Sequence, residues 1–95
     1  MLKVVAKNFA DKSKIEEILK LYKELVELTR KEEGCIKYEL FQDEKDSSIL
    51  CMIEEWESRD ALDKHLKSEH FSRIVPKIKK FMIKETELNV YNKLM

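Results

Sequence analysis

The sequence predicts one α+β domain, residues 1–95, in which helices cover one face of an antiparallel β-sheet. Four segments alternate apolar and polar residues with the period of a β-strand, and other segments repeat apolar residues with the period of an α-helix. A chain of 95 residues is long enough for a single core. The elements follow one another as strand, helix, strand, strand, helix, strand, which is the βαββαβ order of a ferredoxin-like sandwich.

Composition excludes several classes of function. Lys and Arg together number 19, as do Asp and Glu, so the net charge is zero and no basic field exists to attract nucleic acid or an anionic membrane. No apolar run reaches the length of a membrane span, and the N-terminus lacks the layout of a signal peptide. We therefore expect a cytoplasmic protein in which the isolated Cys35 and Cys51 are thiols.

The first third of the chain predicts a strand and a helix. Residues Leu2 to Phe9 alternate and are apolar on both sides, which is typical of a central strand. The run from Ser13 to Glu16 matches a capping box, and Gly34, the only glycine, favours the end of the helix because it tolerates the left-handed backbone conformation. The apolar stripe between these signals consists of Ile15, Ile18, Leu19, Tyr22, Leu25, Val26 and Thr29.

Two strands, Cys35–Asp43 and Ile49–Trp56, should then form a hairpin. The second of them is apolar on both faces, so it is also predicted to be central. A turn near Lys45 would place Cys51 opposite Leu40 and would keep the two thiols apart. The sequence therefore predicts no disulfide.

Two helical segments and a strand complete the domain. Ser58 is a suitable N-cap for a short helix, and a second helical segment, 71–81, contains Pro76, which should kink it or start a fresh turn. Residues 85–94 alternate and predict the last strand. The inner face of the short helix carries Ala61, Leu62, His65 and Leu66.

The sheet face that the helices leave uncovered predicts a homodimer. It should display about half of a set of apolar residues, which is more apolar surface than a soluble monomer usually exposes in one patch. Packing of sheet against sheet in a dimer would bury this patch; the alternative is that the residues are scattered and harmlessly exposed. The set consists of Val5, Phe9, Phe41, Ile49, Cys51 and Ile53.

The sequence lacks the motifs that several kinds of binding site require. A single glycine excludes the Gly-rich loops that hold nucleotide phosphates. His65 and His70 are five residues apart, about 140° around a regular helix, which is poor geometry for a shared metal unless the helix breaks between them. The aromatic signature of a ferredoxin-like RNA-binding domain is also missing from the strand 49–56. We expect no metal, no cofactor and no nucleic-acid partner.

One group of residues could form a pocket between the sheet and the helices. Trp56 ends a central strand, and His65 lies on the inward side of the next helix just over two turns later. Tyr38, Glu54 and His70 could join them. The alternatives stay open: a core histidine bonded to a carbonyl, a tryptophan that only fills the core, and a His70 on the surface.

These residues belong to three stretches that are similar to one protein family over nearly the whole chain. The stretches are Glu32-Glu33-Gly34-Cys35 with Tyr38, Met52-Ile53-Glu54-Glu55-Trp56-Glu57-Ser58, and Ala61-Leu62 with His65-Leu66 and His70-Phe71. They resemble the antibiotic biosynthesis monooxygenase family, close to its quinol monooxygenase branch. The resemblance implies a dimeric α+β barrel that oxygenates quinols or polyphenols with dioxygen and without metal, flavin or haem.

The resemblance also implies roles for particular residues. A quinol that loses a proton becomes electron-rich enough to react with dioxygen, so the protein need only supply a base, a dry aromatic pocket and stabilisation of the anion. His65 is the candidate base or orienting donor, and His70 is a second catalytic candidate. The candidate substrate-binding residues are Trp56, Tyr38, Phe71, Glu54 and Asn8.

There are three alternatives to this function. Haem-degrading relatives share an Asn at the position of Asn8, but here His65 stands where they have a Trp, and Val75 falls near their axial His. An isomerase of a phosphorylated quorum-signal breakdown product is similar in its Glu-Glu-Gly segment and both histidines, but has Tyr at Trp56. It would need lysines or an arginine converging on the pocket. A non-catalytic dimer that binds a small ligand is the third alternative.

Overall fold

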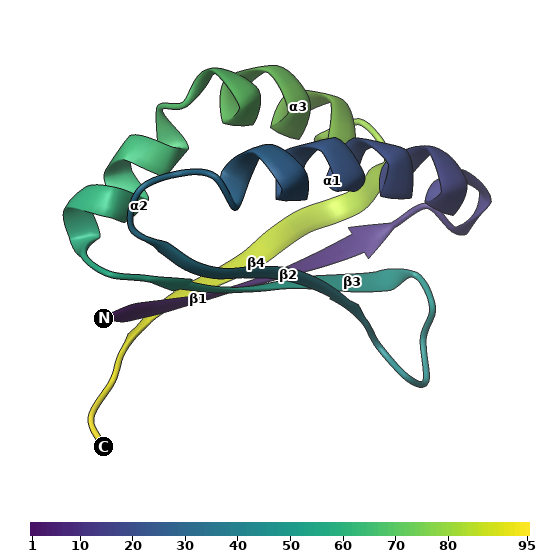
Figure 1. The fold of residues 1–95 in the computed structure, drawn as a ribbon. Helices are drawn as coiled ribbons and strands as arrows, with labels where there is room; N and C mark the ends of the chain where they lie inside the picture. The colour runs from purple at the N-terminus through teal and green to yellow at the C-terminus, as the bar shows by residue number, and fades with distance from the viewer.

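The computed structural model describes all 95 residues and has two layers (Figure 1). A four-stranded antiparallel sheet forms one layer, and three α-helices cover one face of it. This is the predicted ferredoxin-like α+β fold, with two helical segments between the third and fourth strands, as the sequence predicted. The elements are β1 (Leu2–Ala10), the 3₁₀ helix η1 (Lys12–Lys14), α1 (Ile15–Thr29), β2 (Cys35–Gln42), β3 (Ile49–Trp56), α2 (Arg59–Leu66), α3 (Glu69–Lys79) and β4 (Met82–Asn92).

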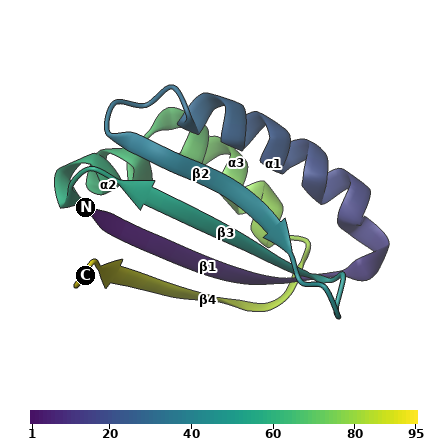
Figure 2. The ribbon, with the colours of Figure 1, turned by 60° about the horizontal axis from the view of Figure 1, so that its bottom comes forward.

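The order of strands across the sheet is β2-β3-β1-β4, so β1 and β3 are central, as their two apolar faces predicted (Figure 2). The β1 and β3 strands pair in regular antiparallel register from Leu2 opposite Trp56 to Phe9 opposite Ile49. The first and third strands of the chain are thus joined along their whole length. Consequently, the end of β3 lies beside the start of β1, at the end of the sheet from which the chain continues into α2.

The hydrophobic core lies between the sheet and the helices. Alternate residues of β1 and β3 point toward the helices, while α1 and α3 supply the opposing apolar side chains. Burial of such side chains contributes about 1.5–3 kcal/mol each, so this layer dominates the stability of the domain. The core consists mainly of Val4, Ala6, Ile18, Tyr22, Leu25, Leu50, Met52, Trp56, Ile74 and Ile78.

The start of α1 differs from the predicted capping box. Ser13 lies inside η1, and its amide and hydroxyl both donate to Asp11 Oδ1, at 3.0 and 2.8 Å. Lys14 precedes the α-helix without a side-chain cap. The capping box was wrong because Asp11, two residues earlier, already holds the Ser13 hydroxyl, so the chain enters α1 through a turn of 3₁₀ helix.

The hairpin register differs by one residue from the prediction. Cys35 lies opposite Trp56, as expected, but a bulge between Cys35 and Lys37 shifts every later pair. Cys51 therefore faces Phe41 and not Leu40. An extra residue in one strand of a pair produces this shift and cannot be read from alternation alone. Both cysteines are free thiols.

The last helix and the last strand have boundaries that differ from the predicted ones. Helix α3 spans Glu69–Lys79, where the segment 71–81 was predicted, and Pro76 lies inside it and does not start a new turn. Strand β4 begins at Met82, three residues before the predicted start at 85, and ends at Asn92. None of the helices is long and apolar enough to cross a membrane.

All six apolar residues of the uncovered face, Val5, Phe9, Phe41, Ile49, Cys51 and Ile53, lie on that face, more than the half expected. The strand pairings place them together on the side of β1, β2 and β3 that points away from the helices. Phe9 is covered by the ammonium groups of Lys84 and Lys7, 3.9 and 5.6 Å from the ring centroid. Dimerisation through this face stays a prediction.

Candidate functional site

The site begins with the break between α2 and α3. Helix α2 ends at Leu66 and α3 begins at Glu69, with Ser68 between them. The Ser68 hydroxyl donates to the His65 carbonyl (2.7 Å) and accepts from the Phe71 amide (3.3 Å), so one side chain ends one helix and caps the next. This break is the condition under which the two histidines could converge.

The turn after α1 brings a carboxylate to the same place. Gly34 adopts φ +87°, and a Cβ atom added to it would lie 2.5 Å from the Ala61 Cβ of α2. Only glycine combines this backbone conformation with so close an approach. The Gly34 carbonyl also accepts from the Glu57 amide (2.8 Å), which holds the turn against the end of β3. Glu32, in this turn, thereby faces α2.

Glu32 joins the two histidines. Its Oε2 atom lies 2.7 Å from His65 Nδ1 and 2.7 Å from His70 Nε2, so one carboxylate oxygen bonds to both rings. In the sequence, Glu32 is part of the Glu-Glu-Gly stretch and is not among the predicted site residues. The available signal was its place just before the single glycine, where a helix must end and the chain must turn inward.

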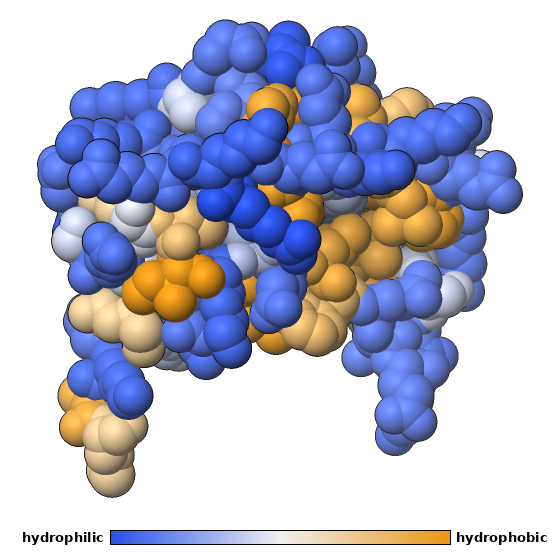
Figure 3. Space-filling model, viewed as in Figure 1, coloured by the Kyte–Doolittle hydropathy of each residue, from blue (hydrophilic) through white to orange (hydrophobic).

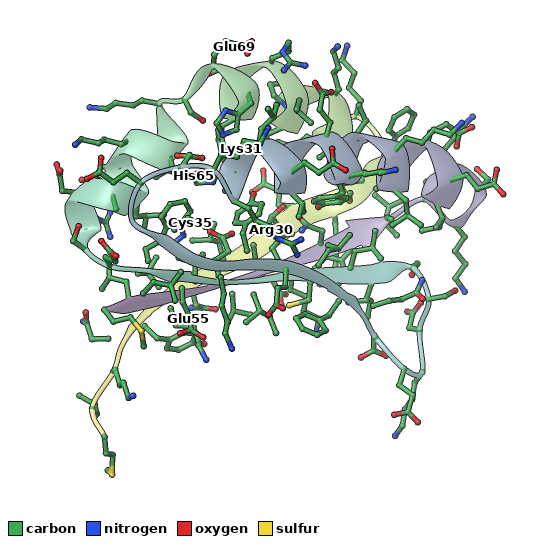
Figure 4. All side chains as sticks on the ribbon, viewed as in Figure 1. Arg30, Lys31, Cys35, Glu55, His65 and Glu69 are labelled. Atoms are coloured by element: carbon green, nitrogen blue, oxygen red, sulfur yellow. The ribbon has the colours of Figure 1, made fainter.

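Aromatic rings surround His65. The Trp56, Phe71 and Tyr38 ring centroids lie 4.6, 5.1 and 5.2 Å from the imidazole centroid. His65 is 1% exposed and Trp56 is fully buried. Figure 4 shows His65 on the side of the sheet that the helices cover. The structure thus brings together His65, His70 and the three aromatic residues that the sequence suggested.

Protonation of the cluster follows from its geometry. An ionised carboxylate only accepts hydrogen bonds, so both nitrogens that face Glu32 carry protons. The second nitrogen of the His65 ring, Nε2, then holds the lone pair in the neutral form. Burial lowers the pKa of His65, although the hydrogen bond to Glu32 opposes this shift. His65 is therefore neutral near pH 7 and has a basic nitrogen among aromatic rings.

A second buried acid lies beside this group. Trp56 Nε1 donates to Glu54 Oε1 at 2.9 Å, and Glu54 is paired across the strands with Tyr38. Burial raises the pKa of Glu54 to about 7, so this carboxyl can gain or lose a proton near neutral pH. Burial also raises the pKa of the Tyr38 phenol, which stays neutral and can act only as a hydrogen-bonding hydroxyl.

Asn8 lies apart from the cluster. Asn8 pairs with Leu50, whereas Trp56 pairs with Leu2 at the start of β1. Leu2 and Asn8 are six residues apart, which is roughly 20 Å at about 3.3 Å per residue of strand. Its amide nitrogen donates to the Ala6 carbonyl (3.2 Å), and its oxygen accepts from the Thr86 hydroxyl (2.6 Å). The structure does not bring Asn8 to the histidines.

Two hollows in the surface lie away from His65. One of about 540 Å³ is lined by both chain ends, including Met1 and Met95. Another of about 270 Å³ lies between α1 and β2, lined in part by Leu19, Val26 and Leu40, where apolar surface shows in Figure 3. Because Trp56 and His65 are almost fully buried and line neither hollow, a ligand can reach the imidazole only if neighbouring side chains move.

The fold and the site together define a small ferredoxin-like α+β protein with a buried histidine between a carboxylate and aromatic rings. Residues 1–77 match the family model for antibiotic biosynthesis monooxygenase. The chain belongs to the antibiotic biosynthesis monooxygenase family, which confirms the resemblance found in the sequence.

Known relatives agree with this membership. A conserved protein from Methanosarcina mazei Go1 is 44% identical, with a TM-score of 0.97 over 98% of this chain and 92% of that one. A structure described as an antibiotic biosynthesis monooxygenase is 42% identical, with a TM-score of 0.96 over all of both chains. The uncharacterized Synechocystis protein sll1783 is 35% identical over 93% of this chain, which spans only 60% of that curated relative's length.

Proposed function

We propose that this protein is a cofactor-independent monooxygenase that acts on a quinol or polyphenol with dioxygen. The observation that carries the proposal is the 2.7 Å contact between His65 Nδ1 and Glu32 Oε2 inside a wall of three aromatic rings. It supplies a base of fixed orientation among aromatic rings, against which an aromatic substrate would stack once neighbouring side chains move. Family membership and a 42% identical relative described as a monooxygenase support the same reaction class.

In the proposed mechanism, His65 Nε2 accepts a phenolic proton from the substrate. The imidazolium that results is stabilised by Glu32, which already accepts the hydrogen bond from Nδ1. The substrate anion is electron-rich enough to transfer electrons to dioxygen. One oxygen atom enters the ring and the other leaves as water with two hydrogens of the substrate, which supplies all four electrons. A hydroquinone and O₂ thus give a hydroxyquinone and H₂O.

The surroundings of His65 favour this chemistry. Its 1% exposure keeps water from the imidazole, and a dry site strengthens the interaction of the anion with nearby donors. Glu54, with a pKa of about 7, can return a proton during the later steps. Tyr38 and Trp56 offer flat surfaces for the substrate ring.

The isomerase alternative gains no such support. A ligand that carries phosphate needs a cation in the pocket, and no lysine or arginine side chain bonds to Glu32, His65 or His70. Arg30 directs its Nε atom to the Tyr38 carbonyl (3.1 Å). We therefore keep a quinol or polyphenol as the proposed substrate class.

The proposal is tested by oxygen uptake of chelator-treated protein against a panel of hydroquinones. The native chain should consume oxygen faster than the autoxidation blank, and His65→Gln should lose about 10²- to 10⁴-fold in rate because it removes the base. Glu32→Gln should also slow uptake, since it no longer favours the tautomer with a basic Nε2. Glu33→Gln, which changes the exposed neighbouring carboxylate, is the matched control and should retain the native rate.

Two results would contradict the proposal. One is uptake no faster than the blank across the whole panel. The other is uptake that persists in His65→Gln when circular dichroism shows that the variant is folded. Identification of the product by mass spectrometry with ¹⁸O₂ separates oxygenation, which places one labelled atom in the product, from simple oxidation to a quinone, which places none.

A further inference from the structure

Three metal-binding side chains meet at the corner between α2, α3 and the turn after α1. Glu32, His65 and His70 each offer one ligand atom, and these atoms all lie within 4.8 Å of one another. They include both histidines of the chain. In the mechanism above only one imidazole nitrogen, His65 Nε2, acts on the substrate. The atoms that face Glu32 hold and stabilise the imidazole in that mechanism, and none of them touches the substrate.

These ligand atoms point toward one place. His65 Nδ1 and His70 Nε2 both lie 2.7 Å from the same oxygen of Glu32, so the two rings are already aimed at a common centre. A bound metal ion lies about 2.0–2.2 Å from imidazole nitrogen and carboxylate oxygen, which separates neighbouring ligand atoms by about 3 Å or more. Because both nitrogens point at the position that Oε2 now holds, an ion there requires the Glu32 carboxylate to withdraw by one metal–oxygen distance, about 2 Å.

The ligands differ in mobility in a way that suits metal entry. His65 is held in the core at 1% exposure, whereas the side chains of Glu32 and His70 are 16% and 15% exposed. The ring of His65 is thus a fixed ligand, and the two others lie between the core and solvent. Glu32 belongs to a turn and can move outward without disturbing a helix.

We propose that Glu32, His65 and His70 form a binding site for a divalent transition-metal ion. Imidazole with a carboxylate favours Zn²⁺, Co²⁺ or Fe²⁺ over Ca²⁺ and Mg²⁺, which prefer oxygen ligands throughout. Three protein ligands leave at least one coordination position free for water or a small molecule. The ion replaces the protons on His65 Nδ1 and His70 Nε2, so its binding releases protons.

Metal binding has a consequence for the oxygenase, and this consequence alone rests on the proposed function. An ion on Nδ1 leaves His65 Nε2 protonated and unable to act as a base. Zn²⁺ should therefore inhibit oxygen uptake, and a chelator should restore it. The metal site itself is independent of turnover and is tested without substrate.

The test is titration of chelator-treated, reduced protein with Co²⁺, followed by the visible d–d absorption of the ion. We expect saturation at one ion per chain. His70→Gln and Glu32→Gln should each weaken binding by at least about tenfold, the low end of the loss seen even when groups that only support metal ligands are changed. Glu33→Gln should bind like the native chain. Circular dichroism of each variant establishes that it is folded, and Zn²⁺ should raise the Tm of the native chain and of Glu33→Gln more than that of His70→Gln or Glu32→Gln.

Two results would overturn the metal site. The first is the absence of saturable absorption, even after the chain is unfolded and refolded with Co²⁺ to remove any barrier to entry. The second is binding of equal affinity in folded His70→Gln. Coordination by cysteine would show as an ultraviolet thiolate-to-cobalt absorption lost in Cys35→Ser, and this also counts against the proposed ligand set.

Discussion

Glu54 shows how burial changes the chemistry of a single side chain. It is 6% exposed at the helix-facing side of β3, where alternation placed it between Met52 and Trp56. Its one side-chain hydrogen bond comes from the Trp56 indole, which is neutral and does not offset the loss of water around a charge. A carboxyl that is ordinarily ionised at pH 7 is therefore only partly ionised here.

This burial predicts a pH dependence of stability. The pKa of Glu54 rises from 4.5 to about 7 on folding, so below pH 4.5 the group is protonated in both states and adds no pH dependence. As pH rises from 4.5 to about 7, the unfolded chain ionises first, and the free energy of unfolding falls. The fall is on the order of 3 kcal/mol.

Urea denaturation of the native chain and Glu54→Gln from pH 4.5 to 8 measures this effect. The difference in stability between the two should change in favour of the glutamine variant as pH rises and should level off above pH 7. A difference that is constant over the range would show that Glu54 ionises equally in both states.

At the scale of elements, two short connections create the site. The break at Ser68 rotates His70 relative to His65, and the turn at Gly34 directs Glu32 toward both. On one continuous helix, residues five apart would point about 140° away from each other. Neither connection contains a catalytic group, but the cluster depends on both.

Gly34→Ala tests the tight turn. The new Cβ would meet Ala61 at 2.5 Å in a left-handed backbone, so we expect a loss of about 2–4 kcal/mol from backbone strain and overpacking together. In an Ala61→Gly background the contact disappears, and the same substitution should cost only the backbone part, about 1–2 kcal/mol. Denaturant unfolding of the four chains measures both. Equal costs in the two backgrounds would contradict the steric role of Ala61.

At the scale of the whole molecule, the face of the sheet that points away from the helices has no other element packed against it within one chain. Its six apolar residues lie side by side on three strands, and Phe41 is 47% exposed. We propose that two copies pack through this face and bury it, because a large apolar patch left exposed on a soluble protein usually marks an interaction surface.

Light scattering after size exclusion tests the dimer. The native chain should have a mass of twice its 11.4 kDa, and Ile53→Lys, which places a charge in the middle of the face, should shift it to the monomer. Leu19→Lys changes a 44% exposed residue on the helical layer and should leave the dimer intact. A monomeric native chain, or a dimer that survives Ile53→Lys, would contradict the proposed interface.

The sequence by itself determined the order of elements, the central places of β1 and β3 and the position of His65 on the inward side of α2. Those features follow from local periodicity, which the burial of one face imposes on each element. Only the tertiary structure decided that Glu32 joins both histidines, that Asn8 lies far from them and that a bulge shifts the hairpin. These depend on how separate segments meet in space, because a contact between residues 33 or 38 positions apart leaves no periodic trace in either segment.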